Sequence, residues 1–259
     1  MEAVPYGTSR ASVTRLPGND VEADRLAVEE PLEIRVDGTA VAVTMRTPGN
    51  DEELAIGFCL TEGIRPLAAH PPADLAANIV EVEAPGADLR TVQRSFYTSS
   101  SCGVCGKGAL EAVAVDAPRI ESDLAVPFAV LAALPVALAE AQATFALTGG
   151  VHATGLFTPD GTLLCVREDV GRHNAMDKVI GWAFGKGLLP LARSVLCVSG
   201  RLSFELVQKA AVAGCPVLVA VGAPSSLAVK LADDRGVTLC GFVRDGAATA
   251  YTHPQRIVP

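Results

Sequence analysis

The sequence predicts an α/β protein whose mixed sheet is covered by helices on both faces. The main observation is that short apolar strands alternate with helices after residue 146, a pattern typical of such sheets. The second is composition, because 49% of the 259 residues are hydrophobic and 19% are charged, which excludes disorder and a coiled coil. Strands are expected at 152–157, 163–168, 194–198, 217–221 and 238–243, and helices at 174–184, 204–213 and 225–233.

The first half of the chain predicts a smaller α+β subdomain. Two strand-like runs, 32–36 and 39–47, flank Asp37-Gly38, a strong hairpin signal. A helix is expected after Asn50 as its N-cap, because three acids follow it. Further strands are expected at 79–82 and 91–97, and a helix at 127–144 that Pro135 kinks or splits. The expected division is a loose tail over 1–30, this subdomain over 31–145 and an α/β ligand-binding domain over 146–259.

Charge and hydropathy limit the possible partners. The formal net charge of −8 argues against unselective nucleic-acid binding, which depends on neutralising phosphates. The mean hydropathy of +0.34 raises the question of a membrane, but Gly214, Pro216 and Gly222 interrupt the most apolar run, 210–229. No secretory signal is visible in the first 20 residues. We therefore expect a cytoplasmic protein that binds neither membranes nor nucleic acid.

Two of the seven cysteines form a reactive-looking pair. Five cysteines stand singly in apolar stretches and are expected to be buried. Cys102 and Cys105 lie in the Ser/Gly-rich loop TSSSCGVCGKG, where Lys107 favours a thiolate. Structural zinc, a thioredoxin-type redox pair and a purely structural loop are alternatives. Sulfur transfer is favoured because no second CxxC completes a zinc site and Gly106-Lys107-Gly108 is a poor helix start.

Three strand-to-helix turns predict an anion site. Arg172 and His173 stand at the expected start of the helix over 174–184, where either an anion or salt bridges of Arg172 and Lys178 with Asp169 and Asp177 are possible. Ligands of open α/β sheets bind beyond the carboxyl ends of strands. The candidate ligand-binding residues in the other two turns are Ser199, Gly200, Arg201 and Ser225. His152 either packs in a strand or lines the same pocket.

Several common signatures are absent. The chain has no G-x-G-x-x-G, no P-loop, no H-E-x-x-H and no G-x-S-x-G. The zinc deaminase signature is incomplete, because Ser101 replaces its proline and no H-x-E precedes it. No metal site is therefore predicted, and a zinc nucleoside deaminase is disfavoured.

The motifs together resemble the formate dehydrogenase accessory sulfurtransferases, the FdhD/NarQ family. The resemblance runs from about Glu33 to Arg256 and keeps the motifs in order. They are TPGNDEELAIGFCLTEGI, SCGVCGKG, TGGVHATGLF, REDVGRHNAMDKVIG, SGRLSFELVQKA and GFVRDGAATAYTHPQR.

The resemblance implies a fold and an activity. The fold is a three-layer, cytidine-deaminase-like α/β domain with a smaller N-terminal subdomain, in a homodimer. The implied activity is sulfur transfer: Cys102 accepts sulfur as a persulfide from a cysteine desulfurase, Cys105 assists, and the sulfur passes to a molybdenum (or tungsten) bis-guanine-dinucleotide cofactor. Formate dehydrogenase is the implied recipient of that cofactor. The stretch implied to bind it is Phe242, Val243, Arg244, Asp245, Gly246 and Ala247.

Overall fold

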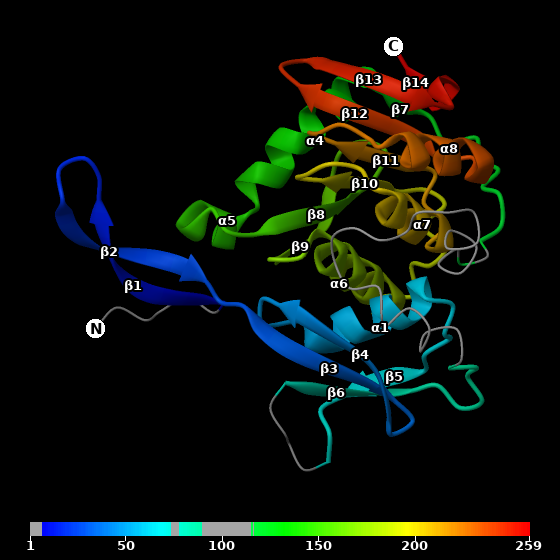
Figure 1. Cartoon of the computed structure of the whole chain (residues 1–259). Helices are drawn as coiled ribbons and strands as arrows, with labels where there is room; N and C mark the ends of the chain where they lie inside the picture. The colour runs from blue at the N-terminus through cyan, green and yellow to red at the C-terminus, as the bar shows by residue number, and fades with distance from the viewer. Residues whose placement is uncertain (1–6, 74–77, 90–114, 116) are drawn as a thin grey trace.

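The structure, a computed structural model, describes residues 7–73, 78–89, 115 and 117–259. A larger α/β unit, a smaller unit below it and a projecting hairpin make up these residues (Figure 1). The expected strand at 91–97 and the loop with Cys102 and Cys105 lie outside the described residues. No helix in the described ranges is long and apolar enough to cross a membrane.

The larger unit is built on a six-stranded mixed sheet, which confirms the predicted fold class. Its strand order is β13-β12-β11-β10-β8-β9. Strands β10, β11 and β12 run parallel, and β8, β9 and β13 are antiparallel to their neighbours. The bounds are β8 (His152–Phe157), β9 (Leu163–Asp169), β10 (Val195–Val198), β11 (Val217–Ala220), β12 (Thr238–Arg244) and β13 (Ala247–Thr252).

Helices cover both faces of this sheet because its central strands are apolar on both sides. Leu196 and Val198 of β10 pack toward α6 (Arg172–Gly185), α7 (Phe204–Val212) and α8 (Ser226–Arg235). Cys197, between them in the strand, points to the opposite face of the sheet and belongs to the core under α4 (Phe128–Glu140). Helix α4 continues through Pro135, and a short helix α5 (Ala143–Thr148) follows it. Although α4 lies within the predicted 31–145 subdomain, it packs on the large sheet.

The smaller unit is a four-stranded sheet with one helix. The order is β4-β3-β6-β5, with β3 (Glu30–Val36), β4 (Thr39–Arg46), β5 (Ala68–His70) and β6 (Ile79–Glu83). Asp37 and Gly38 form the predicted hairpin turn, both with positive φ. Helix α1 (Asp51–Thr61) packs its apolar side on this sheet, and its opposite side contacts α6.

Buried polar contacts join the two units. Lys209 of α7 donates to Asp177 of α6 at 2.8 Å and to Thr61 of α1 at 2.8 Å. Arg167 of β9 pairs with Glu53 of α1, at 2.8 Å between Nη2 and Oε1. Because buried charges are stable only when paired, these contacts fix how α1 sits on the larger unit.

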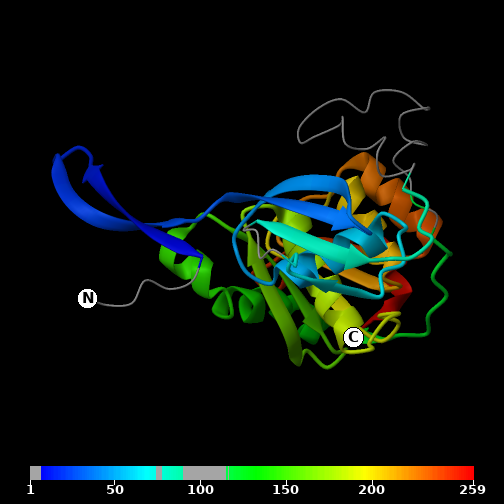
Figure 2. The same ribbon diagram turned by 90° about the horizontal axis from the view of Figure 1, so that it is seen from below.

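The N-terminal residues differ from the prediction of a loose tail. Strands β1 (Thr8–Arg15) and β2 (Asp20–Ala27) form an antiparallel hairpin with all eight positions of each strand paired. The hairpin extends away from the two units, and α5 contacts β2 (Figures 1 and 2). At the other terminus, β14 (Ile257–Val258) follows the 3₁₀ turn η1 (Pro254–Arg256) and pairs in parallel with β7 (Val126–Pro127).

Candidate ligand site at the strand ends

Three strand ends meet at one edge of the large sheet. The backbone N–H of Gly222, after β11, donates to the carbonyl of Gly200, after β10, at 3.0 Å. The N–H of Phe242 donates to the carbonyl of Gly222 at 3.2 Å. A Cβ on Gly222 would lie 2.9 Å from the Gly200 oxygen, so only glycine allows this close approach. The structure therefore brings the predicted Ser199–Arg201 turn, the turn before Ser225 and Phe242 together.

Three helices begin beside these strand ends. Arg172 is the first residue of α6, Ser203 is the N-cap of α7 and Ser225 is the N-cap of α8. The Ser225 hydroxyl accepts the N–H of Ala228 at 3.2 Å, so its oxygen is engaged as a helix cap. Helix N-termini carry unpaired N–H groups and partial positive charge, and both favour anions.

Two uncharged histidines lie close to this region. His173 Nε2 lies 3.2 Å from the Ser203 hydroxyl and 3.8 Å from a Glu205 carboxylate oxygen. Burial, together with the positive charges of Lys209 and Arg172, lowers the pKa of His173 to about 4. Burial and Arg172 also lower the pKa of His152. Both imidazoles are therefore neutral at pH 7, and each can donate one hydrogen bond and accept another.

The basic residues of the Arg172 region divide into two groups. Lys178 pairs with buried Asp169 at 2.7 Å, and Asp177 pairs with Lys209 instead of with Arg172. Arg172 itself has no ion pair with any of the residues that the structure describes. The salt-bridge alternative thus holds for Lys178 and not for Arg172, whose positive charge acts on the nearby Glu205 carboxylate without an ion pair among the described residues.

The predicted stretch from Phe242 to Ala247 has mixed surroundings. Phe242 has a φ of 53° and is 40% exposed beside Gly222. Val243 is fully buried, so its side chain belongs to the core and not to the site. Asp245 and Gly246, both with positive φ, form the turn between β12 and β13. Arg244 and Ala247 flank that turn on the surface, and Arg201 is likewise exposed.

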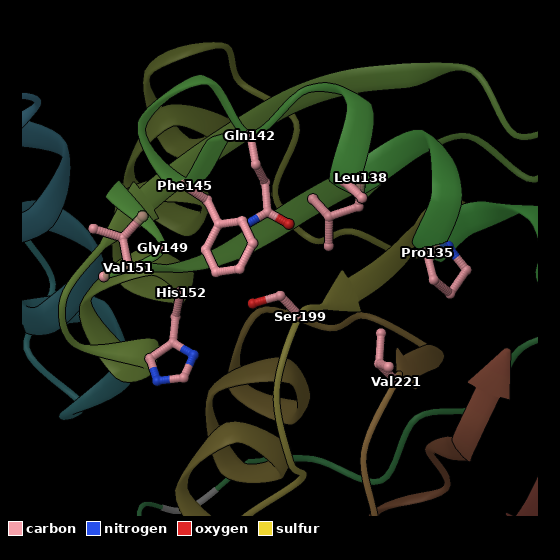
Figure 3. Close-up of a pocket in the computed structure, with 11 residues that line it drawn as sticks. Pro135, Leu138, Gln142, Phe145, Gly149, Val151, His152, Ser199 and Val221 are labelled. Atoms are coloured by element: carbon pink, nitrogen blue, oxygen red, sulfur yellow. The ribbon is translucent and has the colours of Figure 1, made fainter. Parts of the chain in front are cut away.

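A cavity of about 460 Å³ opens on the α4 side of the same strand ends. Figure 3 shows Phe145, Leu138 and Pro135 around it, with Ser199 and Val221 at its floor and His152 at its rim. Ser199 accepts the N–H of Ala153 at 2.9 Å. Of the lining residues, the sequence predicts only Ser199 as ligand-binding, and it leaves His152 either packed in a strand or lining the pocket. Leu138, Gln142 and Phe145 have no motif, and only the folded structure brings them together.

The five cysteines that the structure describes are buried and unpaired, as predicted. Burial raises the thiol pKa of Cys165 to about 11 and those of the other four to about 12. The five buried cysteines are Cys59, Cys165, Cys197, Cys215 and Cys240. Within the described ranges, no cluster of three or more His, Cys, Asp or Glu side chains is placed to hold a metal ion.

Fold and site together define an α/β protein with three helix N-termini beside its strand ends and an adjoining cavity of about 460 Å³. A family model described as the FdhD/NarQ family matches residues 27–258, and the chain belongs to that family. The chain is 50% identical over 279 residues to the sulfur carrier protein FdhD of Mycobacterium tuberculosis, covering 97% of this chain and 99% of the relative. It is 53% identical over 270 residues to the FdhD of Mycolicibacterium paratuberculosis, covering 96% and 98%.

A solved structure has the same fold. It is a candidate formate dehydrogenase accessory protein from Desulfotalea psychrophila, with a TM-score of 0.76 and 26% sequence identity. The match covers 97% of this chain and 98% of that chain. The α/β architecture predicted from the sequence is thus also that of an experimentally determined structure.

Proposed function

We propose that this protein is a sulfur carrier for the maturation of formate dehydrogenase. Cys102 accepts sulfur as a persulfide from a cysteine desulfurase and delivers it to a molybdenum bis-guanine-dinucleotide cofactor. Membership of the FdhD/NarQ family and the name of the relatives, sulfur carrier protein, support the proposal. We further propose that it acts in the cytoplasm as a homodimer.

The observation that carries the proposal is the state of the other thiols. A sulfur carrier needs an accessible thiolate, because the thiolate and not the thiol is the nucleophile. Five of the seven cysteines are buried, with pKa values raised to about 11 or 12. Elimination leaves Cys102 and Cys105, in the loop that the sequence already favours for sulfur chemistry.

The sulfur steps are ordinary thiolate exchanges. The Cys102 thiolate attacks the outer sulfur of the donor persulfide, the donor S–S bond breaks, and the donor cysteine leaves as a thiolate. Delivery by Cys105 follows the same logic: its thiolate attacks Cys102 Sγ, sulfide leaves, and a Cys102–Cys105 disulfide forms. The two thiols supply the two electrons that reduce the sulfane sulfur to sulfide, and a cellular thiol reductant regenerates them.

The strand ends suit the acceptor. A guanine-dinucleotide cofactor carries pyrophosphates, and Arg172 and Arg201 lie beside three helix N-termini there. Neutral His173 and the Ser203 hydroxyl add hydrogen bonds without a negative charge. We propose that Arg172, His173, Ser199–Arg201, Ser225 and the exposed part of 242–247 contact the cofactor.

Mass spectrometry after incubation with a cysteine desulfurase and cysteine tests the proposal. The wild-type protein should gain about 32 Da, one sulfur atom, on the peptide containing Cys102. Cys102→Ala should lose the adduct and fail to support formate dehydrogenase maturation, whereas Cys105→Ala should still accept sulfur. An unmodified Cys102 would refute the proposal. So would one tightly bound zinc per chain that is lost in Cys102→Ala/Cys105→Ala.

A further inference from the structure

The hairpin of β1 and β2, residues 8–27, has no core of its own; we call it the arm. Its one buried residue is Thr8, and none of its residues belongs to the three apolar clusters of the described chain. Helix α5 contacts β2, and the arm extends away from both units (Figures 1 and 2). A two-stranded hairpin without further packing is marginally stable in water. The arm is therefore expected to be covered by another surface.

The contacts within the arm do not replace a core. Arg15 pairs with Glu22 and, at 3.1 Å, with Asp24. Ion pairs exposed to this degree contribute only about 0–1 kcal/mol. At the far end of the arm, Leu16 is 78% exposed and Val21 is 73% exposed. The free end of the arm thus presents apolar side chains to solvent, which suits contact with another apolar surface.

Helices α4 and α5 provide a second uncovered apolar surface, which we call the α4–α5 face. Residues 128–148 contain a single charged side chain, Glu140. The inner side of α4 packs on the large sheet, whereas Val136 on its outer side is 61% exposed. Seven of the thirteen exposed large hydrophobic side chains in the described chain lie on this face or on the arm: Leu16, Val21, Leu26, Phe128, Val136, Phe145 and Leu147. Few charges together with exposed aromatic side chains are typical of the centre of a protein–protein interface.

The charges on the two surfaces favour a second copy of this chain over a lipid surface. Helices that lie on membranes carry Lys and Arg beside their apolar side. Residues 128–148 contain neither, and the far end of the arm carries Asp20 and Glu22, which anionic lipids repel. One chain supplies both an uncovered arm and an uncovered apolar face. In a two-fold dimer, each arm can therefore cover the α4–α5 face of the other copy, and the same contact forms twice.

The dimensions of the arm are sufficient for such a dimer. Each strand has eight residues, which span about 26 Å, and two paired strands are about 10 Å wide. One side of the arm therefore covers about 260 Å². Two arms and the two surfaces that they cover bury about 1,000 Å², which reaches the size expected of a specific interface.

We propose that the arm of one chain packs on the α4–α5 face of a second copy, and that the two exchanged arms hold the dimer together. The inference rests on the homodimer proposed above and on none of the sulfur chemistry. It assigns the surface at which the two copies meet and the residues that make it.

Sedimentation velocity of the full chain with one substitution at three positions tests the inference. Val21→Asp places a carboxylate on the arm, and Val136→Asp places one on the α4–α5 face. Val43→Asp is the matched control, because Val43 is 55% exposed on β4 of the smaller unit. The wild type and the control should sediment as two chains. The other two variants should each raise the dimer dissociation constant at least about tenfold, because a buried, unpaired carboxylate is costly.

Cross-linking keeps the test valid even if an aspartate variant fails to fold. Two chains are mixed, one with Val21→Cys and the other with Val136→Cys, and both also carry Cys102→Ala/Cys105→Ala. The other five cysteines are buried, so a bismaleimide reagent meets only the new thiols. The mixture should give a linked pair of chains. A mixture of Val43→Cys with Val136→Cys, in the same background, should not.

Four results would overturn the inference. They are a monomeric wild type, a dimer that survives both Val21→Asp and Val136→Asp, equal dissociation of the Val43→Asp control, and absence of the cross-link. A monomeric wild type that floats with phosphatidylglycerol vesicles would assign the two surfaces to a membrane instead.

The sulfur assay distinguishes this inference from the sulfur-carrier proposal. A monomer that still forms the persulfide on Cys102 would reject the dimer and its arms alone. The expected dimer without persulfide formation would reject the sulfur-carrier proposal alone.

Discussion

The crossing of α1 and α6 depends on Gly57 of α1 and Gly181 of α6, and replacing Gly181 should destabilise the protein. A Cβ on Gly181 of α6 would lie 1.9 Å from the backbone oxygen of Glu53 in α1. Real Cβ atoms stay at least 3.0 Å from such an atom, so the helices must separate by at least 3.0 − 1.9 = 1.1 Å. Overpacking costs about 1–3 kcal/mol and occasionally more, and a shift of two whole helices belongs at the upper end. Alanine returns about 1 kcal/mol through helix propensity.

We therefore expect Gly181→Ala to lower the free energy of unfolding by about 2 kcal/mol. Gly185→Ala is the matched control in the same helix, because a Cβ there meets nothing within 4 Å. That variant should gain up to about 1 kcal/mol. Guanidinium unfolding followed by circular dichroism measures both. If Gly181→Ala were stabilised as much as Gly185→Ala, the close helix crossing would be wrong.

Three further predictions concern charges and thiols. Lys209→Met leaves the buried Asp177 carboxylate without its cation and should lower the free energy of unfolding, measured in urea, by about 3–5 kcal/mol. The double variant Lys209→Met/Asp177→Asn should restore most of that loss. Equal losses in both variants would contradict the ion-pair argument. Native iodoacetamide treatment should modify at most two thiols per chain and denatured treatment all seven, so a third native adduct would refute the burial of the other five. The imidazole of His173 should titrate near pH 4 by NMR, below the ordinary 6.5. Because the pKa of His173 is depressed in the folded protein, its contribution to stability is present above pH 6.5 and is lost as the pH falls toward 4. An NMR titration midpoint near 6.5 would exclude the burial of His173 among positive charges.

Local rules explain what could be predicted from the sequence. The hairpin at Asp37-Gly38 follows from two residues that tolerate positive φ between alternating strands. The strand-end turns follow from the alternation of strands and helices, which places carboxyl ends at one edge of a sheet. The sequence predicts Arg172 as a candidate anion-binding residue because it is a basic residue next to a helix start. That pattern involves only neighbouring residues of the chain.

Features that depend on distant contacts were missed or differ. Strand β2 is mostly exposed, so its side chains show little of the apolar alternation that signals a strand. Asn50 stands at the N-cap of α1 as expected, but its side chain makes no capping bond, and Asp51 accepts the N–H of Gly49 at 3.3 Å. Gln142 follows an Ala-rich helix and lines the cavity only because α4 and α5 fold over Ser199.

The segment from Arg167 to Lys178 shows why one motif supported two interpretations. The helix start and the salt bridges that it predicts involve different residues. Arg172 and His173 occupy the first turn of α6, where they meet the ends of β8 and α7. One turn later, Asp177 and Lys178 are buried in ion pairs, and Asn174 donates to the carbonyl of Met45 at 2.8 Å. Because 3.6 residues make a turn, one helix can present its N-terminus to a ligand and its side to the smaller unit. The attachment of the smaller unit therefore also fixes the position of Arg172.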